Sequence, residues 1–120
     1  NIFETGIAPE NYTGVLRKLL PSHVIIIDAA EMRASAGYTT IINSESIQEL
    51  IPSTHSLPLS ILANYIEQEF SAKVIILCIQ PKELSFNTNA SVEVKDAVKK
   101  LAIIISDTLV NKELCYLEPK

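Results

Sequence analysis

The sequence predicts an α/β fold of three layers, in which helices flank a mostly parallel, twisted sheet. Two continuous apolar runs, His23–Ala29 and residues 72–80, have the length and the β-branched content of buried strands. Amphipathic stretches with helical spacing precede and follow these runs. Because buried strands that alternate with helices build layered α/β proteins, we expect one α/β domain over residues 1–120.

The elements of the first half follow from hydrophobic spacing and from stop signals. Residues 1–4 read as a short opening strand. Apolar residues between Tyr12 and Leu20 recur at helical spacing, and Pro21 ends that helix. His23–Ala29 is the first buried strand, and the β-branched run at residues 38–42 predicts a second strand at the edge of the sheet.

The second half alternates in the same way. A short helix is expected at residues 44–50, and a longer one begins near Pro58 and ends near Phe70. Residues 72–80 form the second buried strand, which Pro81 stops. A long helix is expected at residues 91–110, followed by a polar, loosely held tail.

Composition narrows the function classes. The chain has a net charge of −4 with acids and bases interspersed, so no basic stripe favours nucleic acid as a partner. No apolar run approaches the roughly 18 residues that span a bilayer, and no secretory signal is visible, so we expect no membrane partner. The two cysteines, Cys78 and Cys115, do not form a disulfide framework, and Cys78 reads as a core residue. A reducing, cytoplasmic location is expected.

Two side chains are candidate metal ligands. Asp28 ends the first buried run, and open α/β sheets bind ligands beyond the carboxyl ends of their strands. His55 lies just ahead of the helix near Pro58, where its imidazole could reach the same crevice. A carboxylate and a neutral imidazole suit zinc or nickel, although a third ligand is not evident.

Each candidate has a plainer interpretation. Asp28 could instead cap the turn that follows it, and His55 could be a capping or packing histidine. Glu4 could line the crevice and support the ligands, or it could cap the next helix. Glu31 is expected to be solvated. A serine-hydrolase elbow and a phosphate-binding glycine loop are both missing from the sequence.

Five short segments, in this order and spacing, give the chain a resemblance to a known family. They are A-P-E-N at 8–11, I-D-A-A-E-M at 27–32, T-H-S-L-P-L at 54–59, I-Q-P at 79–81 and V-K-D-A-V at 94–98. The chain resembles the hydrogenase maturation endopeptidases, especially the branch that processes the large subunit of the formate-linked hydrogenase. The agreement extends from about Gly6 to about Leu109.

The resemblance implies a nickel-dependent endopeptidase that removes the C-terminal extension of a [NiFe]-hydrogenase large-subunit precursor. It implies that Asp28 and His55 contact nickel that the substrate supplies, and that other divalent ions can occupy the site. The resemblance does not identify the group that activates water. Two alternatives stay open. One is a non-catalytic fragment or metal-recognition module that binds the precursor, and the other is an unrelated α/β hydrolase.

This sequence departs from the family at its N-terminus. The family's first metal-contacting acid, its opening strand and its crossover helix have no counterpart in residues 1–120. We therefore expect an exposed apolar strip where those elements would pack, next to residues 1–3 and His23–Ala29.

Overall fold

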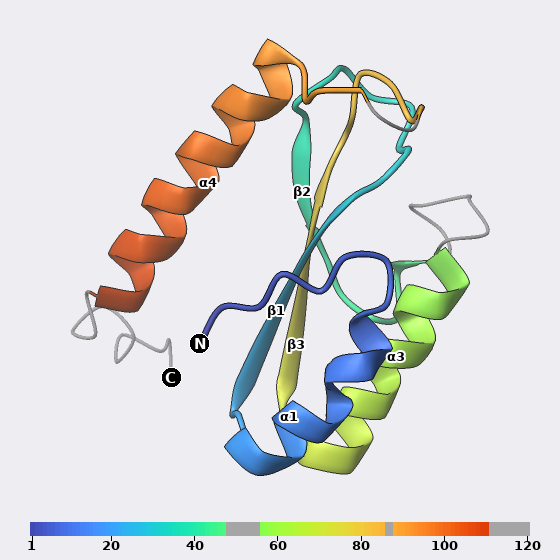
Figure 1. The fold of residues 1–120 in the computed structure, drawn as a ribbon, viewed down its shortest axis with the longest axis vertical. Helices are drawn as coiled ribbons and strands as arrows, with labels where there is room; N and C mark the ends of the chain where they lie inside the picture. The colour runs from blue at the N-terminus through green and yellow to red at the C-terminus, as the bar shows by residue number, and fades with distance from the viewer. Residues whose placement is uncertain (48–55, 86–87, 111–120) are drawn as a thin grey trace.

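The computed structural model describes residues 1–47, 56–85 and 88–110 (Figure 1). In chain order its elements are the 3-10 turn η1 (Pro9–Tyr12), helix α1 (Thr13–Leu19), strands β1 (His23–Ala29) and β2 (Thr39–Ile42), helix α3 (Ser56–Phe70), strand β3 (Lys73–Ile79) and helix α4 (Val92–Val110). These bounds confirm the predicted helices and strands from Tyr12 onward to within a few residues. Of the helix expected at residues 44–50, residues 44–46 form a turn and Ile47 is helical, whereas residues 48–50 lie outside the described residues. The tail from residue 111 also lies outside them.

Within the described residues the sheet has three strands in the order β1-β3-β2. β1 and β3 run parallel, from the pair His23 and Lys73 to the pair Ala29 and Ile79. β2 is antiparallel to β3 over a shorter ladder, from Thr39 and Ile79 to Ile42 and Ile76. The sheet is therefore mixed, with its longer ladder parallel, and the α/β class is confirmed.

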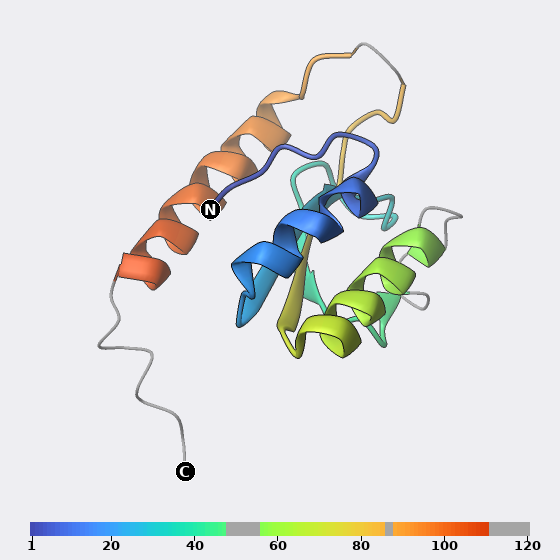
Figure 2. The ribbon, with the colours of Figure 1, turned by 60° about the horizontal axis from the view of Figure 1, so that its bottom comes forward.

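Helices cover the two faces of the sheet unequally. α1 and α3 lie side by side on one face, and α4 lies opposite the other face (Figure 2). Alternate residues of β3, among them Val74 and Ile76, point toward α3 and pack with Ala63 and Ile66. The core of the molecule is this layer between β3 and the α1–α3 pair.

The prediction that His23–Ala29 is a fully buried strand is wrong for one face of β1. Val24 and Ile26 are half-buried against the core, whereas Ile25 is 39% exposed and Ile27 is 54% exposed. Burial of a strand depends on its neighbours as well as on its own side chains. Among the described residues no strand lies beyond β1, so its α4-facing side keeps an apolar strip open to solvent. Such a strip was expected from the sequence.

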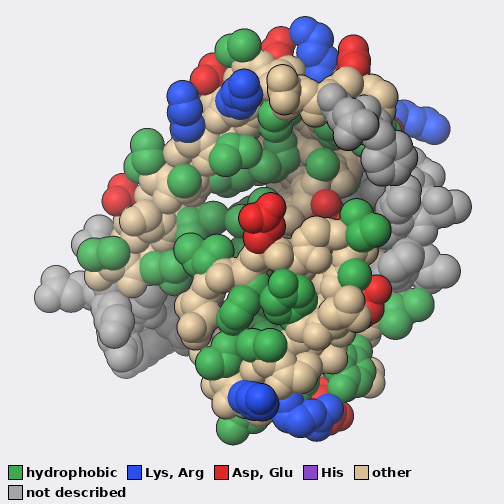
Figure 3. Space-filling model, viewed as in Figure 1, with side chains coloured by type: hydrophobic (Ala, Val, Ile, Leu, Met, Phe, Trp, Pro, Cys, Tyr) green, Lys and Arg blue, Asp and Glu red, His purple; other side chains and the backbone are tan. Residues whose placement is uncertain are grey.

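α4 stands away from the sheet although its apolar face points toward it. Ser91 caps the helix by accepting a hydrogen bond from the Val94 N–H at 3.3 Å. No residue of α4 is buried, and Val98 is 49% exposed. Figure 3 shows hydrophobic side chains gathered along the hollow between α4 and the rest of the molecule. An apolar cavity of about 110 Å³ lies in this space, lined by Ile27, Ile79, Val98, Leu101, Ala102 and Ile105.

Residues 1–4 do not form the predicted opening strand. They are irregular, and Ile2 is fully exposed. The segment is attached to η1 by Tyr12, whose hydroxyl donates to the Glu4 carbonyl oxygen at 3.1 Å and whose ring lies 5.7 Å from that of Phe3. A strand needs a partner for its backbone groups, and no described strand pairs with this segment.

None of the helices in the described ranges is both long and apolar enough to cross a membrane.

Candidate functional site at the carboxyl edge of the sheet

Asp28 lies at the carboxyl end of β1, as predicted, and it is exposed. It shares a sheet face with Val24 and Ile26, because side chains along a strand alternate. Its Oδ1 accepts a hydrogen bond from the Ala29 N–H at 2.8 Å. This contact fits the interpretation of Asp28 as a capping residue, and it is also compatible with metal binding, since a carboxylate has about four lone-pair positions.

For the other two predicted site residues, the structure describes no side-chain contact at the edge of the sheet. His55 lies outside the described residues, so its sharing of a crevice with Asp28 stays a prediction. Glu4 is exposed and makes its described hydrogen bond through its backbone carbonyl oxygen. Within residues 1–47, 56–85 and 88–110, no three His, Cys, Asp or Glu side chains gather closely enough to hold a metal ion.

Gln80 is the residue at this edge that sequence reasoning missed. It directly follows β3 and is only 3% exposed. Its side-chain Oε1 accepts hydrogen bonds from the N–H groups of Met32 at 2.7 Å and Ala34 at 3.3 Å. Its Nε2 donates to Glu31 Oε2 at 3.1 Å and to the Pro81 carbonyl oxygen at 3.0 Å. The whole amide is therefore hydrogen-bonded inside the protein.

The backbone of Gln80 is bound to the same loop. Its N–H donates to the Tyr38 carbonyl oxygen at 2.8 Å, and its carbonyl oxygen accepts from the Gly37 N–H at 2.8 Å. Residues 30–38 join β1 to β2, which lie on opposite sides of β3, so this loop crosses the end of β3. Gln80 lies at the end of β3, where this loop crosses it. A long polar residue between a buried run and a proline is the sequence signal that could have pointed to it.

Glu31 is not the solvated residue that the sequence suggested. It is half-buried, and its two carboxylate oxygens accept from Gln80 Nε2 and from the Arg33 N–H, the latter at 2.9 Å. Arg33 itself has a left-handed backbone, with φ of 56°. The loop after Asp28 is thus held in one conformation by Glu31 and Gln80 together.

Cys78 is a core residue, as predicted. It is completely buried and free of any disulfide. Burial, together with repulsion by the nearby Asp28 carboxylate, raises the pKa of its thiol to about 11. The thiol is therefore neutral at pH 7 and is a poor nucleophile.

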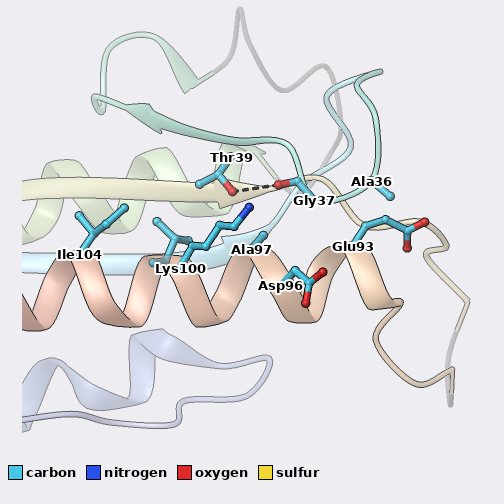
Figure 4. Close-up of a pocket in the computed structure, with 9 residues that line it drawn as sticks. Ala36, Gly37, Thr39, Glu93, Asp96, Ala97, Lys100 and Ile104 are labelled. Carbon is cyan, nitrogen blue, oxygen red and sulfur yellow. Dashed lines mark hydrogen bonds between the residues drawn. The ribbon is translucent and has the colours of Figure 1, made fainter.

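A second cavity lies away from Asp28. It measures about 440 Å³ and lies between the start of β2 and α4 (Figure 4). Glu93, Asp96 and Lys100 from α4 line it together with the turn at Gly37, where Thr39 Oγ1 donates to the Gly37 carbonyl oxygen at 3.1 Å. Asp28 is not among its lining residues. The acidic strand end and the cavity are separate features.

A layered α/β domain with an acid at the carboxyl edge of its sheet defines a broad class of ligand-binding proteins and enzymes. Comparison with known proteins narrows that class. The sequence pattern of the hydrogenase maturation protease family matches residues 1–108. The chain therefore belongs to the hydrogenase maturation protease family, and the alternative of an unrelated α/β hydrolase is rejected.

Individual relatives agree with this assignment. MJ0631 of Methanocaldococcus jannaschii, named as a hydrogenase maturation protease, is 39% identical over 85 residues, or 71% of this chain and 50% of that protein. The Hydrogenase 3 maturation protease of Escherichia coli K12 is 33% identical over 99 residues, which cover 82% of this chain and 63% of the relative. The chain thus spans between half and two thirds of the length of these curated relatives.

Solved structures show the same fold. The endopeptidase HycI from Escherichia coli superposes with a TM-score of 0.74 at 33% identity, covering 82% of this chain and 64% of that one. The [NiFe] hydrogenase maturation protease HycI from Thermococcus kodakarensis superposes with a TM-score of 0.81 at 29% identity, covering 92% of this chain and 70% of that one.

Proposed function

We propose that the full encoded protein is an endopeptidase that removes the C-terminal extension of a [NiFe]-hydrogenase large-subunit precursor. The observation that carries this proposal is the family match over residues 1–108, which includes the exposed acid at the end of β1. The names of the relatives support a protease of hydrogenase maturation. The formate-linked hydrogenase as the source of the precursor is our expectation from the resemblance of sequence segments.

We propose that Asp28 and His55 contact nickel that is already bound in the precursor. The position of Asp28 supports this role, because it lies exposed at the edge where α/β proteins bind ligands. An acid and an imidazole fill only part of a metal's coordination shell, so they bind a free ion weakly but can add to a shell that the substrate has begun. Cleavage would then depend on metal loading of the substrate. When present, nickel supplies Lewis acidity, and other divalent ions can occupy the same ligands.

The charge of the chain supports a protein substrate rather than a nucleic acid. The net charge is −4, and basic residues do not gather in one stripe. We expect the reaction to take place in the cytoplasm, where thiols such as that of Cys78 stay reduced.

The test is cleavage of purified precursor by the full encoded chain, including the residues encoded upstream of Asn1. We expect mass spectrometry to show loss of the C-terminal extension from nickel-loaded precursor and no loss from nickel-free precursor. Equal cleavage of both forms would contradict the nickel dependence. Binding of the precursor without any cleavage would contradict the enzymatic proposal.

That second outcome would favour the alternative of a non-catalytic module that binds the precursor. The sequence upstream of Asn1 separates the two proposals: a glycine-rich loop with paired acids there would supply the third ligand.

A further inference from the structure

The loop that follows Asp28 has few strand partners for its backbone. β1 and β2 lie on either side of β3, so residues 30–38 must cross the carboxyl end of β3. Directly after β1, the Ala30 N–H donates a backbone hydrogen bond to the Ile79 carbonyl oxygen of β3 at 3.0 Å. Beyond that point the loop is bound by the side chain of Gln80, whose Oε1 accepts hydrogen bonds from the N–H groups of Met32 and Ala34.

A hydrogen bond between the Gln80 amide and the Glu31 carboxylate adds to the contact between Gln80 and the loop. Gln80 presents an oxygen to the loop N–H groups and an N–H donor to the Glu31 carboxylate, and its neutral amide does both at once. Because Gln80 is 3% exposed, water cannot readily replace either contact. The pair therefore determines the path by which the chain leaves β1.

That path begins one residue after Asp28. The Asp28 Oδ1 accepts from the Ala29 N–H, so the orientation of the Ala29 peptide affects the orientation of the carboxylate. We propose that Gln80, acting through Glu31 and the loop N–H groups, is a positioning residue for the Asp28 carboxylate. The proposal rests on the proposed function, because the effect of a displaced carboxylate is measured as peptide cleavage.

The test uses Gln80→Glu in the full encoded chain. This change keeps the size of the side chain but removes the amide that donates to Glu31 at 3.1 Å and to the Pro81 carbonyl oxygen at 3.0 Å. The two acids then repel or share one proton. We expect kcat for nickel-loaded precursor to fall at least about tenfold with KM little changed, because a small displacement of a reacting group is costly. Gln68→Glu makes the same chemical change at an exposed position of α3 and should cleave like the wild type.

The double variant Gln80→Glu with Glu31→Gln restores the pairing with the two groups exchanged. Glu at position 80 can accept from the loop N–H groups and from the new amide at position 31, but it no longer donates to the Pro81 carbonyl oxygen. We expect a partial recovery, with kcat at least about threefold above that of Gln80→Glu. A merely structural role for Gln80 would instead lower the melting temperature and the kcat of the variants together, without recovery in the exchanged pair. Wild-type kcat in folded Gln80→Met, or no recovery in the folded double variant, would overturn the proposal.

A second variant and a second measurement keep the test decisive. Gln80→Met removes the same hydrogen bonds without adding charge, so its kcat decides the case if Gln80→Glu does not fold. Hydrogen exchange of the Met32 and Ala34 amides in residues 1–120 reports on the contact without any substrate. We expect exchange at least about tenfold faster in Gln80→Met, and unchanged exchange would overturn the proposal. If the wild type does not cleave the precursor, the proposed function is wrong. The hydrogen-exchange result then still tests whether Gln80 holds the Met32 and Ala34 amides.

Discussion

Asp28 and Cys78 are register partners in the parallel ladder of β1 and β3, which sets an exposed carboxylate next to a fully buried thiol. The two residues differ in exposure because β1 lies at the edge of the described sheet and β3 lies at its centre. The Asp28 carboxylate adds to the effect of burial on the Cys78 thiol, whose pKa is about 11. The site thus combines an exposed acid and a neutral, buried thiol within one pair of strands.

This pairing predicts a loss of stability in alkaline solution. The folded protein keeps the Cys78 proton up to a pKa of about 11, whereas the unfolded chain releases it near 9. The unfolded state therefore binds fewer protons between these values, and the free energy of unfolding falls as pH rises through this window, by on the order of 2 kcal/mol. Urea unfolding between pH 8 and pH 11 measures the slope. Cys78→Ala should flatten it, and parallel slopes in both proteins would contradict the assignment.

Gly37→Ala should destabilise the protein strongly. Gly37 has φ of 85°, and a Cβ there would lie 2.6 Å from the Glu93 carbonyl oxygen at the start of α4. We expect a loss of more than about 2 kcal/mol in thermal or urea unfolding. Gly6→Ala is the matched control, since Gly6 has φ of 58° with open space around it, and it should lose only about 1 kcal/mol. Equal losses would show that α4 does not pack on Gly37.

The apolar strip on β1 predicts that Ile27→Ala has different effects in two lengths of chain. Ile27 is 54% exposed in residues 1–120, so we expect a loss below about 1 kcal/mol there. In the full encoded chain the loss should exceed about 2 kcal/mol, if upstream residues cover β1. Ile76→Ala, at a completely buried position, should cost about 2–5 kcal/mol in both. The same small loss for Ile27→Ala in both lengths would contradict the expected covering element.

The sequence predicted strands well where a strand's own residues determine it. The bounds of β1 follow from its run of β-branched residues, and those of β3 follow from an apolar run that ends before Pro81. Burial could not be predicted in this way, because the exposure of Ile27 depends on which elements lie beside β1. Residues 1–4 failed as a strand for the same reason, since pairing requires a second strand.

The candidate site was predicted only in part. The position of Asp28 at the carboxyl end of β1 could be predicted because the residue ends an apolar run, which is a local signal. The contact between Glu31 and Gln80 could not be predicted from the sequence, because it joins residues 49 positions apart and arises where the loop crosses β3. Its discovery required the strand order, which no local pattern contains.

His55→Ala should abolish processing of nickel-loaded precursor in the full encoded chain, if the imidazole contacts the metal. The residue precedes α3 in the chain, so we expect its loss to remove a ligand rather than core packing. The melting temperature, measured alongside mass loss from the precursor, distinguishes the two roles. A fall of several degrees would support a structural histidine instead, and wild-type cleavage would reject the metal contact.

Asp28→Asn tests the central claim, that this exposed acid contacts the metal of the substrate, most directly. The amide keeps the shape of the side chain and removes the charge that attracts a divalent cation. Asp96→Asn is the matched control, because Asp96 is also exposed but lines the separate cavity beside α4. The decisive measurement is the rate at which nickel-loaded precursor loses its C-terminal extension. We predict at least about a hundredfold slower loss with Asp28→Asn and an unchanged rate with Asp96→Asn. Wild-type rates with Asp28→Asn would contradict the account.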